Sequence, residues 1–106
     1  MSSLDGTNVP ATHFPKLTEV NYHTWKFDMQ AMLMRNGSWL IVDGKITKPT
    51  SPGDDQDTWM IRDMNAAGII YSYVTKLIQT LVRGNLDSSV DMWNTLKTHF
   101  SQDNAS

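Results

Sequence analysis

The chain contains no cysteine among its 106 residues. A disulfide scaffold, a thiolate zinc site and a cysteine nucleophile are therefore excluded. Long hydrophobic runs are also missing: the run at residues 39–42 is far below the roughly 20 residues that a membrane-spanning helix needs. The polar N-terminus lacks the charged-then-apolar order of a signal peptide. We therefore expect a soluble, cytoplasmic protein.

An excess of one charge is missing as well. Nine Lys and Arg residues face eleven Asp and Glu residues, and the formal net charge is -2. The basic residues occur singly along the chain, whereas binding to a phosphate backbone requires several cations on one surface. We do not expect this stretch to bind nucleic acid by itself.

Catalytic and metal-binding motifs are absent from the sequence. The histidines do not follow a metal-ligand spacing; they are His13, His23 and His99. The acidic group Asp54, Asp55 and Asp57 lacks the twelve-residue calcium-loop pattern and is interpreted as a helix start. Glycine-rich phosphate loops and a serine nucleophile elbow are also missing. We expect no enzyme, no cofactor and no metal.

Helical periodicity is the main positive signal. Hydrophobic residues make up 40% and charged residues 19%, which is typical of one globular domain. A helix is predicted from Tyr22 to Asn36, with apolar residues at spacings of three and four. Asn21 is predicted to cap its start with its side chain, and Gly37 to end it. A short helix with Trp39, Leu40 and Val42 follows, capped by Ser38 and ended by Asp43-Gly44.

Further helices are predicted after a loop at residues 45–56, which contains two prolines and a glycine. A long helix is expected over residues 57–76. Its apolar stripe comprises Trp59, Asp63, Ala66, Ala67, Ile70, Val74 and Leu77, widened by Met60, Met64, Tyr71 and Ile78. Gly68 inside it lowers helix stability, or allows a neighbouring helix to approach closely.

A helical turn through residues 78–82 and a stop at residues 83–85 precede the last helix. This helix is predicted to begin at Ser88 or Ser89, where Ser88 and Asp91 approximate a capping box. The fold class is therefore all-α, a compact bundle of four to five helices of unequal length. We expect a flexible lead-in at residues 1–15, the helical domain at 16–101 and a disordered tail at 102–106.

Tryptophan and methionine are the residues most informative about the core and the surface. Trp25, Trp39, Trp59 and Trp93 are each placed on the apolar face of a predicted helix, where large aromatics supply much of a small core. The alternative, a platform for peptides or nucleobases, normally requires a basic track. Met29, Met32 and Met64 are assigned to inner faces. Met34 and Met60 are expected to be partly exposed, as on an adaptable contact surface. Whether Trp39 faces the core or a partner stays open.

Four motifs follow one another along the chain, at residues 16–25, at residues 39–44, at Trp59 with Ala66, Ile70 and Val74, and at residues 89–100. Their order resembles that in the Gag proteins of copia-type retrotransposons. Residues 16–25 resemble the family's L-x-G-x-N-Y-x-x-W opening, with Glu19 where the family usually has glycine, and residues 39–44 resemble its W-x-x-V-x-G segment. Trp59 with later small and aliphatic residues, and residues 89–100 with W-x-x-L-x-x-x-[YF], complete the set. The core and motif residues are Leu17, Tyr22, Trp25, Met29, Leu33, Trp39, Val42, Gly44, Trp59, Ala66, Ile70, Val74, Trp93, Leu96 and Phe100.

The resemblance implies a structural protein similar to the N-terminal lobe of a Gag capsid. Such domains assemble through helical surfaces into particles, so a second copy of the chain is the implied partner. RNA would be handled only by a downstream zinc knuckle, which this cysteine-free chain lacks. Two other readings remain open: a host-recruited module that binds a peptide or protein in an apolar groove, and a small enzyme, which would need a deep pocket with titratable groups.

Overall fold

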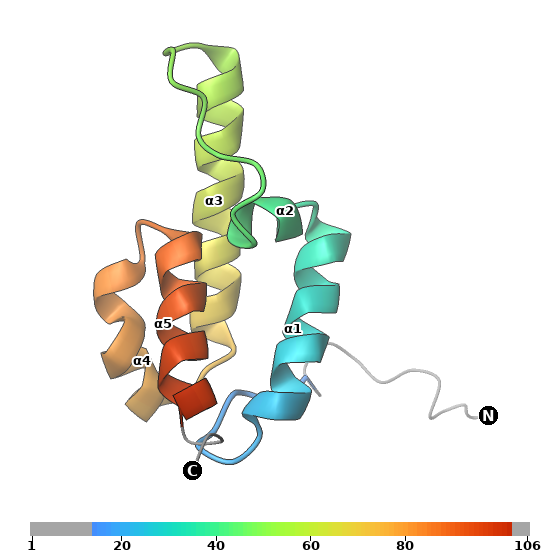
Figure 1. Cartoon of the computed structure of the whole chain (residues 1–106), viewed down its shortest axis with the longest axis vertical. Helices are drawn as coiled ribbons and strands as arrows, with labels where there is room; N and C mark the ends of the chain where they lie inside the picture. The colour runs from blue at the N-terminus through green and yellow to red at the C-terminus, as the bar shows by residue number, and fades with distance from the viewer. Residues whose placement is uncertain (1–13, 103–106) are drawn as a thin grey trace, which may run out of the picture.

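The computed structural model of the chain describes residues 14–102. This part of the chain is all-helical, as the sequence predicts, and forms one bundle (Figure 1). The elements are α1 (Tyr22–Asn36), α2 (Trp39–Val42), α3 (Asp54–Ser72), α4 (Lys76–Val82), a 3-10 turn at Arg83–Asn85, and α5 (Ser89–Gln102). The predicted flexible lead-in lies almost wholly outside the described residues, as do residues 103–106 of the predicted tail. No helix within residues 14–102 is long and apolar enough to cross a membrane.

Helix α1 has the bounds that the periodicity predicts, and Gly37 ends it in the left-handed conformation with φ 83°. The N–H groups of Gly37 and Ser38 donate to the carbonyls of Met34 and Leu33 at 3.1 and 3.0 Å, which is a Schellman motif. The predicted side-chain cap by Asn21 is wrong. Its Oδ1 instead accepts from the Thr18 N–H at 2.7 Å, because the side chain closes the turn before the helix.

The predicted cap of α2 by the Ser38 side chain is also wrong. The Ser38 hydroxyl points back along the chain and donates to Oδ1 of Asn36 at 3.0 Å. Ser38 is fully buried between α1 and α2, so this hydrogen bond satisfies a hydroxyl that has no access to water.

Helix α3 begins at Asp54 and ends at Ser72, so the predicted bounds of 57 and 76 are wrong at both ends. It starts early because Gly53, with φ 151°, redirects the chain, and the Gly53 carbonyl accepts from the Asp57 N–H at 3.0 Å. It stops early because the next residues bond to Leu17 instead. The Leu17 N–H donates to the Tyr73 carbonyl at 2.7 Å, and Leu17 forms an isolated parallel bridge with Val74.

The core is centred on Trp25, which is completely buried. Its indole N–H donates to the Tyr73 carbonyl at 3.0 Å, and its ring stacks on Trp93 with centroids 5.9 Å apart. Aliphatic and aromatic side chains from all five helices surround it, and Phe14 packs against the cluster from the segment before α1. Met92 also belongs to this core with no exposed surface, although the sequence analysis does not select it.

Two apolar residues predicted to face inward are exposed instead. Met64 is 63% exposed and Leu77 is 64% exposed. In α3 the buried positions are Asp63, Ala66, Ala67 and Ile70, and this arrangement turns Met64 outward. Leu77 does not continue the α3 stripe because α3 has already ended, and it lies on the first turn of α4.

A buried carboxylate joins α3 to the start of α5. Oδ1 of Asp63 accepts from the Ser89 N–H at 3.1 Å and from the Ser89 hydroxyl at 2.5 Å. Asp63 is 5% exposed and Ser89 is fully buried, so the bond acts as an N-terminal cap supplied by another helix. The predicted local cap is present too, since the Asp91 N–H donates to Oγ of Ser88 at 3.1 Å.

Tyr22 makes the stability of the folded state depend on pH in the alkaline range. Burial raises the pKa of its phenol above the ordinary value of 10.0, and a hydrogen bond to the Ser101 side chain opposes this rise. The folded state therefore favours the neutral phenol. Its contribution to stability is fully present below pH 10 and is lost as the pH rises through the raised pKa.

We expect Tyr22→Phe to remove this part of the alkaline destabilisation, because phenylalanine has no ionisable group. Urea unfolding at a series of pH values from neutral to alkaline measures it, and the lysines contribute equally to both proteins. The same decrease in stability above pH 10 in the variant and the wild type would contradict the assignment.

Candidate interaction surface

The N-terminal half of α3 projects beyond the other helices, together with the loop that precedes it (Figure 1). We call residues 43–62 the arm. No residue of α3 is buried before Asp63. The loop is fastened to the helix by two side-chain hydrogen bonds, from Trp59 Nε1 to the Ile46 carbonyl and from Gln56 Nε2 to the Pro49 carbonyl, each at 2.9 Å. The arm is thus an ordered projection with little core of its own.

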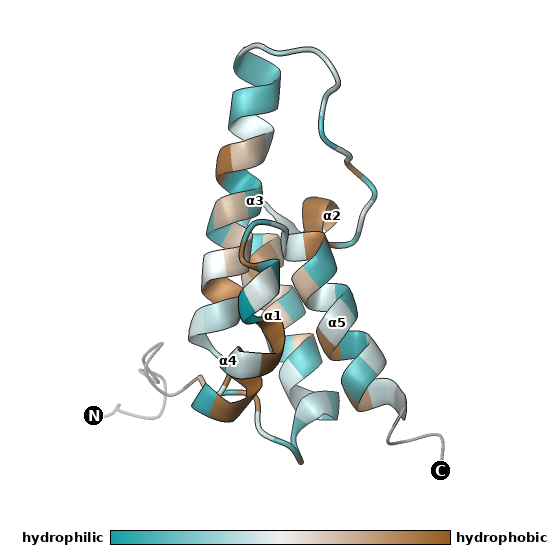
Figure 2. Ribbon diagram, turned by 90° about the vertical axis from the view of Figure 1, so that its left-hand side faces the viewer, coloured by the Kyte–Doolittle hydropathy of each residue, from teal (hydrophilic) through white to brown (hydrophobic). Residues whose placement is uncertain are grey.

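Apolar side chains lie on the exposed surface of α3, in and next to the arm. Met60 is 39% exposed, Ile61 59% and Met64 63%. Figure 2 shows hydrophobic bands within the part of α3 that extends above the other helices. The loop covers the side of the helix that carries Gln56 and Trp59, and at 100° per residue Ile61 and Met64 point to another side. Their grouping distinguishes this surface from the singly scattered apolar side chains that are normal on a protein surface.

A cavity of about 560 Å³ lies beside this apolar surface, where α3 faces the turn between α4 and α5. Its lining is a mixture of apolar, charged and polar side chains: Lys48, Trp59, Met60, Asp63, Met64, Leu86, Asp87 and Ser88. The Asp63 carboxylate is already bonded to Ser89. The apolar residues of the lining are Trp59, Met60, Met64 and Leu86. Apart from Asp63, its charged residues are Lys48 and Asp87.

A second cavity of about 390 Å³ lies where α1, α2 and the arm meet. It is lined by Met34, Gly37, Trp39, Leu40, Ile46 and Arg62. Met34 is 58% exposed, as predicted, and Leu40 is 46% exposed. Trp39 is half-buried, with its ring set edge-on against Trp93 at 5.5 Å, so it belongs partly to the core and partly to this surface.

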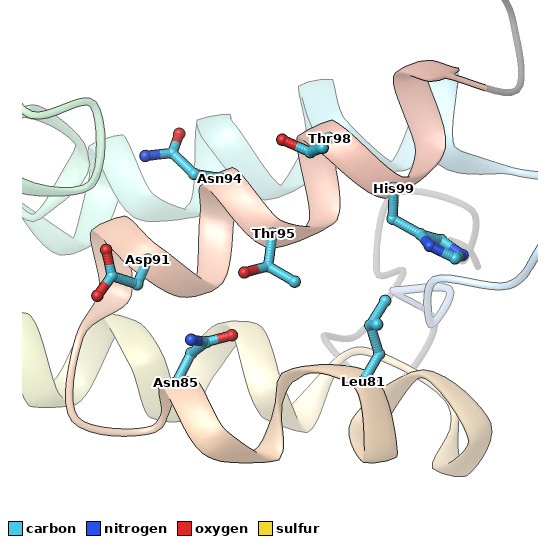
Figure 3. A pocket seen from close by; sticks show the side chains of 7 residues that line it. All are labelled: Leu81, Asn85, Asp91, Asn94, Thr95, Thr98 and His99. Carbon is cyan, nitrogen blue, oxygen red and sulfur yellow. The ribbon is translucent and has the colours of Figure 1, made fainter.

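The groove between α4 and α5 is polar (Figure 3). Its volume is about 510 Å³, and it is lined by Leu81, Asn85, Asp91, Asn94, Thr95, Thr98 and His99. Asp91 and His99, the two ionisable groups, lie near opposite ends of the groove, and their side chains do not approach each other. They do not form a general acid–base pair, which requires hydrogen-bond reach to a shared reactant. In the part of the chain that the structure describes, no three His, Asp or Glu side chains come together as a metal site.

The core and motif residues of the sequence analysis lie almost entirely inside the molecule. Twelve of the fifteen belong to the buried cluster; they are Leu17, Tyr22, Trp25, Met29, Leu33, Val42, Ala66, Ile70, Val74, Trp93, Leu96 and Phe100. Trp39 and Trp59 are half-buried, and Gly44 adopts φ 85° in the turn after α2. Most of these residues therefore build the scaffold, while Trp39 and Trp59 also line cavities at the surface.

The exposed apolar surface comes mostly from other residues. Met34 and Met60 are predicted from the sequence to be exposed, and both are exposed. Ile61 and Leu86 are not among the residues predicted to be exposed. Ile61 could have been found, because an aliphatic residue two positions before Asp63 falls on the opposite side of a helix from the buried stripe.

Comparison with known proteins finds the same family that the motifs resemble. Residues 29–106 match the family model described as gag-polypeptide of LTR copia-type. The match spans more than half of the chain and includes α2 to α5, but not the opening motif at residues 16–25. No curated protein and no solved structure matches the chain.

Proposed function

The chain belongs to the copia-type LTR gag-polypeptide family, and from this premise we propose that it is an assembly module whose copies associate through exposed helical surfaces during particle formation. Such a module needs a rigid scaffold and an apolar surface that is not buried in the core of that scaffold. The observation that carries the proposal is the exposed apolar surface of α3, where Met60, Ile61 and Met64 remain 39, 59 and 63% exposed while the core is filled from other positions.

A second function is favoured by a different observation. The cavity at Met34, Trp39 and Leu40 is apolar and lies on the other side of the arm from Met60 and Met64. A host-recruited member of the family could bind the apolar side chains of a peptide there. If this function is correct, binding of a soluble peptide should shield the side chains of Met34 and Leu40 from solvent. Copies of the chain would not need to associate with one another.

We expect the purified chain to associate reversibly as its concentration rises. Light scattering coupled to size exclusion over a concentration and salt series measures the mean mass. Because the contacts are apolar, association should persist at high salt, which screens charge–charge contacts between surfaces. With the downstream Gag region attached, electron microscopy should show particles.

A strict monomer at every concentration up to the solubility limit would contradict the assembly function, provided that the protein with its downstream region also forms no particles. Association that disappears at moderate salt would show that charged groups, and not the apolar surface of α3, hold the copies together.

A further inference from the structure

We propose that the outer face of α3 binds the same face of a second copy of the chain, with the two α3 helices antiparallel. We call Asp57, Ile61, Met64 and Gly68 the outer face. The inference rests on the proposed function, because it names the surface and the orientation by which copies would associate.

The outer face has the geometry of a helix contact. Its four residues follow one another at spacings of four, three and four, so they form one line along the helix. Ile61 and Met64 in the middle of this line are 59 and 63% exposed. Within residues 14–102, the side chains of α3 that hold the loop, Gln56 and Trp59, lie on a different side of the helix from this line.

Gly68 is the feature that points to another helix. It lies in the interior of α3, where glycine weakens a helix relative to alanine. Its φ is not positive, and a Cβ added there would meet nothing within 4 Å. Neither backbone conformation nor packing within residues 14–102 therefore requires glycine. A missing side chain on an exposed helical line leaves a notch into which a large side chain of a facing helix can fit.

The charges on α3 select the antiparallel orientation. The first turn carries Asp54, Asp55 and Asp57, and no acidic residue follows Asp63 in the helix. A parallel pair would place six carboxylates of two first turns together. An antiparallel pair places each acidic turn beside the other copy's C-terminal half, which Lys76 follows, and it also aligns the helix dipoles favourably.

The register follows from the notch. With the two-fold axis between Met64 and Asn65, Ile61 of each copy lies opposite Gly68 of the other. The largest aliphatic side chain of the line then fills the gap left by glycine, and both Met64 side chains pack at the centre. A second copy of the same face is thus complementary in shape as well as in charge.

Filling the notch tests the surface without damaging the fold. We expect Gly68→Leu to weaken self-association by roughly tenfold or more, since overpacked contacts are costly. Its unfolding midpoint should not decrease, because the added Cβ meets nothing within 4 Å. Gly84→Leu is the matched control, because a Cβ at Gly84 also meets nothing within 4 Å and this residue lies in the 3-10 turn, not on the outer face. Equal association of both variants would overturn the proposal.

Single cysteines test the orientation, since the chain has none of its own. Disulfides need Cα atoms within about 7 Å. In the proposed register Met64→Cys lies beside the two-fold axis and should form a covalent dimer on mild oxidation of the 106-residue chain. Asp57→Cys should not, because the two copies of residue 57 would be about 22 Å apart along the helix axis.

The outcomes separate this surface from the proposed function. Cross-linking of Asp57→Cys would indicate a parallel pair and overturn the proposal. If the wild type associates but Met64→Cys does not cross-link and Gly68→Leu has no effect, copies meet through another surface and only this inference fails. If the wild type never associates, with or without its downstream region, the assembly function fails as well.

Discussion

Trp25→Ala is expected to destabilise the fold by about 3–5 kcal/mol, the usual range for truncating a fully buried aromatic side chain. Trp25 has no exposed surface, and its ring stacks on Trp93 at 5.9 Å. Its indole N–H also donates to the Tyr73 carbonyl, which is the point where α3 ends and the Leu17 segment pairs. The substitution thus opens a cavity and breaks the link between α1 and the α3–α4 connection. Small domains have about 5–15 kcal/mol of stability in total.

Urea unfolding followed by circular dichroism measures this loss, and Trp59→Ala is the matched control. Trp59 is half-buried and donates to the Ile46 carbonyl within the arm, so its truncation should loosen the arm and leave the core intact. Trp25→Phe should fall between the wild type and Trp25→Ala, because it keeps a ring and loses the hydrogen bond. A Trp25→Ala protein no less stable than Trp59→Ala would show that Trp25 is not the centre of the core.

The second large effect is expected for Asp63→Ala, at about 2–4 kcal/mol. Removal of the carboxylate leaves the N–H and the hydroxyl of Ser89 buried without their acceptor. An unsatisfied buried donor costs about 1–3 kcal/mol, and loss of an N-terminal cap costs about 0.5–2 kcal/mol. Both losses act on the joint between α3 and α5, the pair of helices with the most extensive contact in the described part of the chain.

Thermal and urea unfolding of Asp63→Ala, Asp63→Asn and Asp57→Ala would measure this cap. Asparagine keeps an acceptor oxygen and should retain part of the stability. Asp57→Ala removes an exposed carboxylate from the first turn of the same helix and should have a much smaller effect. Equal stability of the Asp63→Ala and Asp57→Ala proteins would contradict the role of Asp63.

Local signals predict the elements whose ends are determined locally. The bounds of α1 follow from the spacing of Tyr22, Trp25, Met29 and Leu33 and from Gly37 with its left-handed φ. The start of α5 follows from Ser88 and Asp91, which form the predicted hydrogen bond. Each of these signals involves residues within one or two helical turns, and the distant cap from Asp63 to Ser89 supports the same start of α5.

The ends of α3 could not be predicted in the same way. Its C-terminus depends on Leu17, which is 56 residues before Tyr73 in the sequence and bonds to its carbonyl. The rotation of α3 about its axis depends on Asp63, whose partner Ser89 is 26 residues away. A hydrophobic pattern assigns Met64 to the core and places Asp63 on the buried stripe without a partner, because it contains no information about that hydrogen bond.

The candidate surface was predictable only in part. Met34 and Met60 are expected to be exposed from their positions on the helix, and they are. For Gly68 the sequence offers two interpretations, a simple loss of helix stability or a close approach by another helix. No neighbour within residues 14–102 lies within 4 Å of a Cβ added at this position, apart from the backbone of α3 itself. A close approach by another helix would therefore have to come from outside the described residues.

The most direct measurement of the central claim is a methyl NMR spectrum of the wild-type chain recorded over a concentration series. If copies associate through the outer face of α3, the methyl signals of Ile61 and Met64 should move as the concentration rises. Those of the exposed Leu77 and of the buried Met29 and Met92 should stay in place. Shifts confined to Leu77 and the rest of α4, or no shifts at any concentration, would contradict the claim that this face of α3 is where copies of the protein meet.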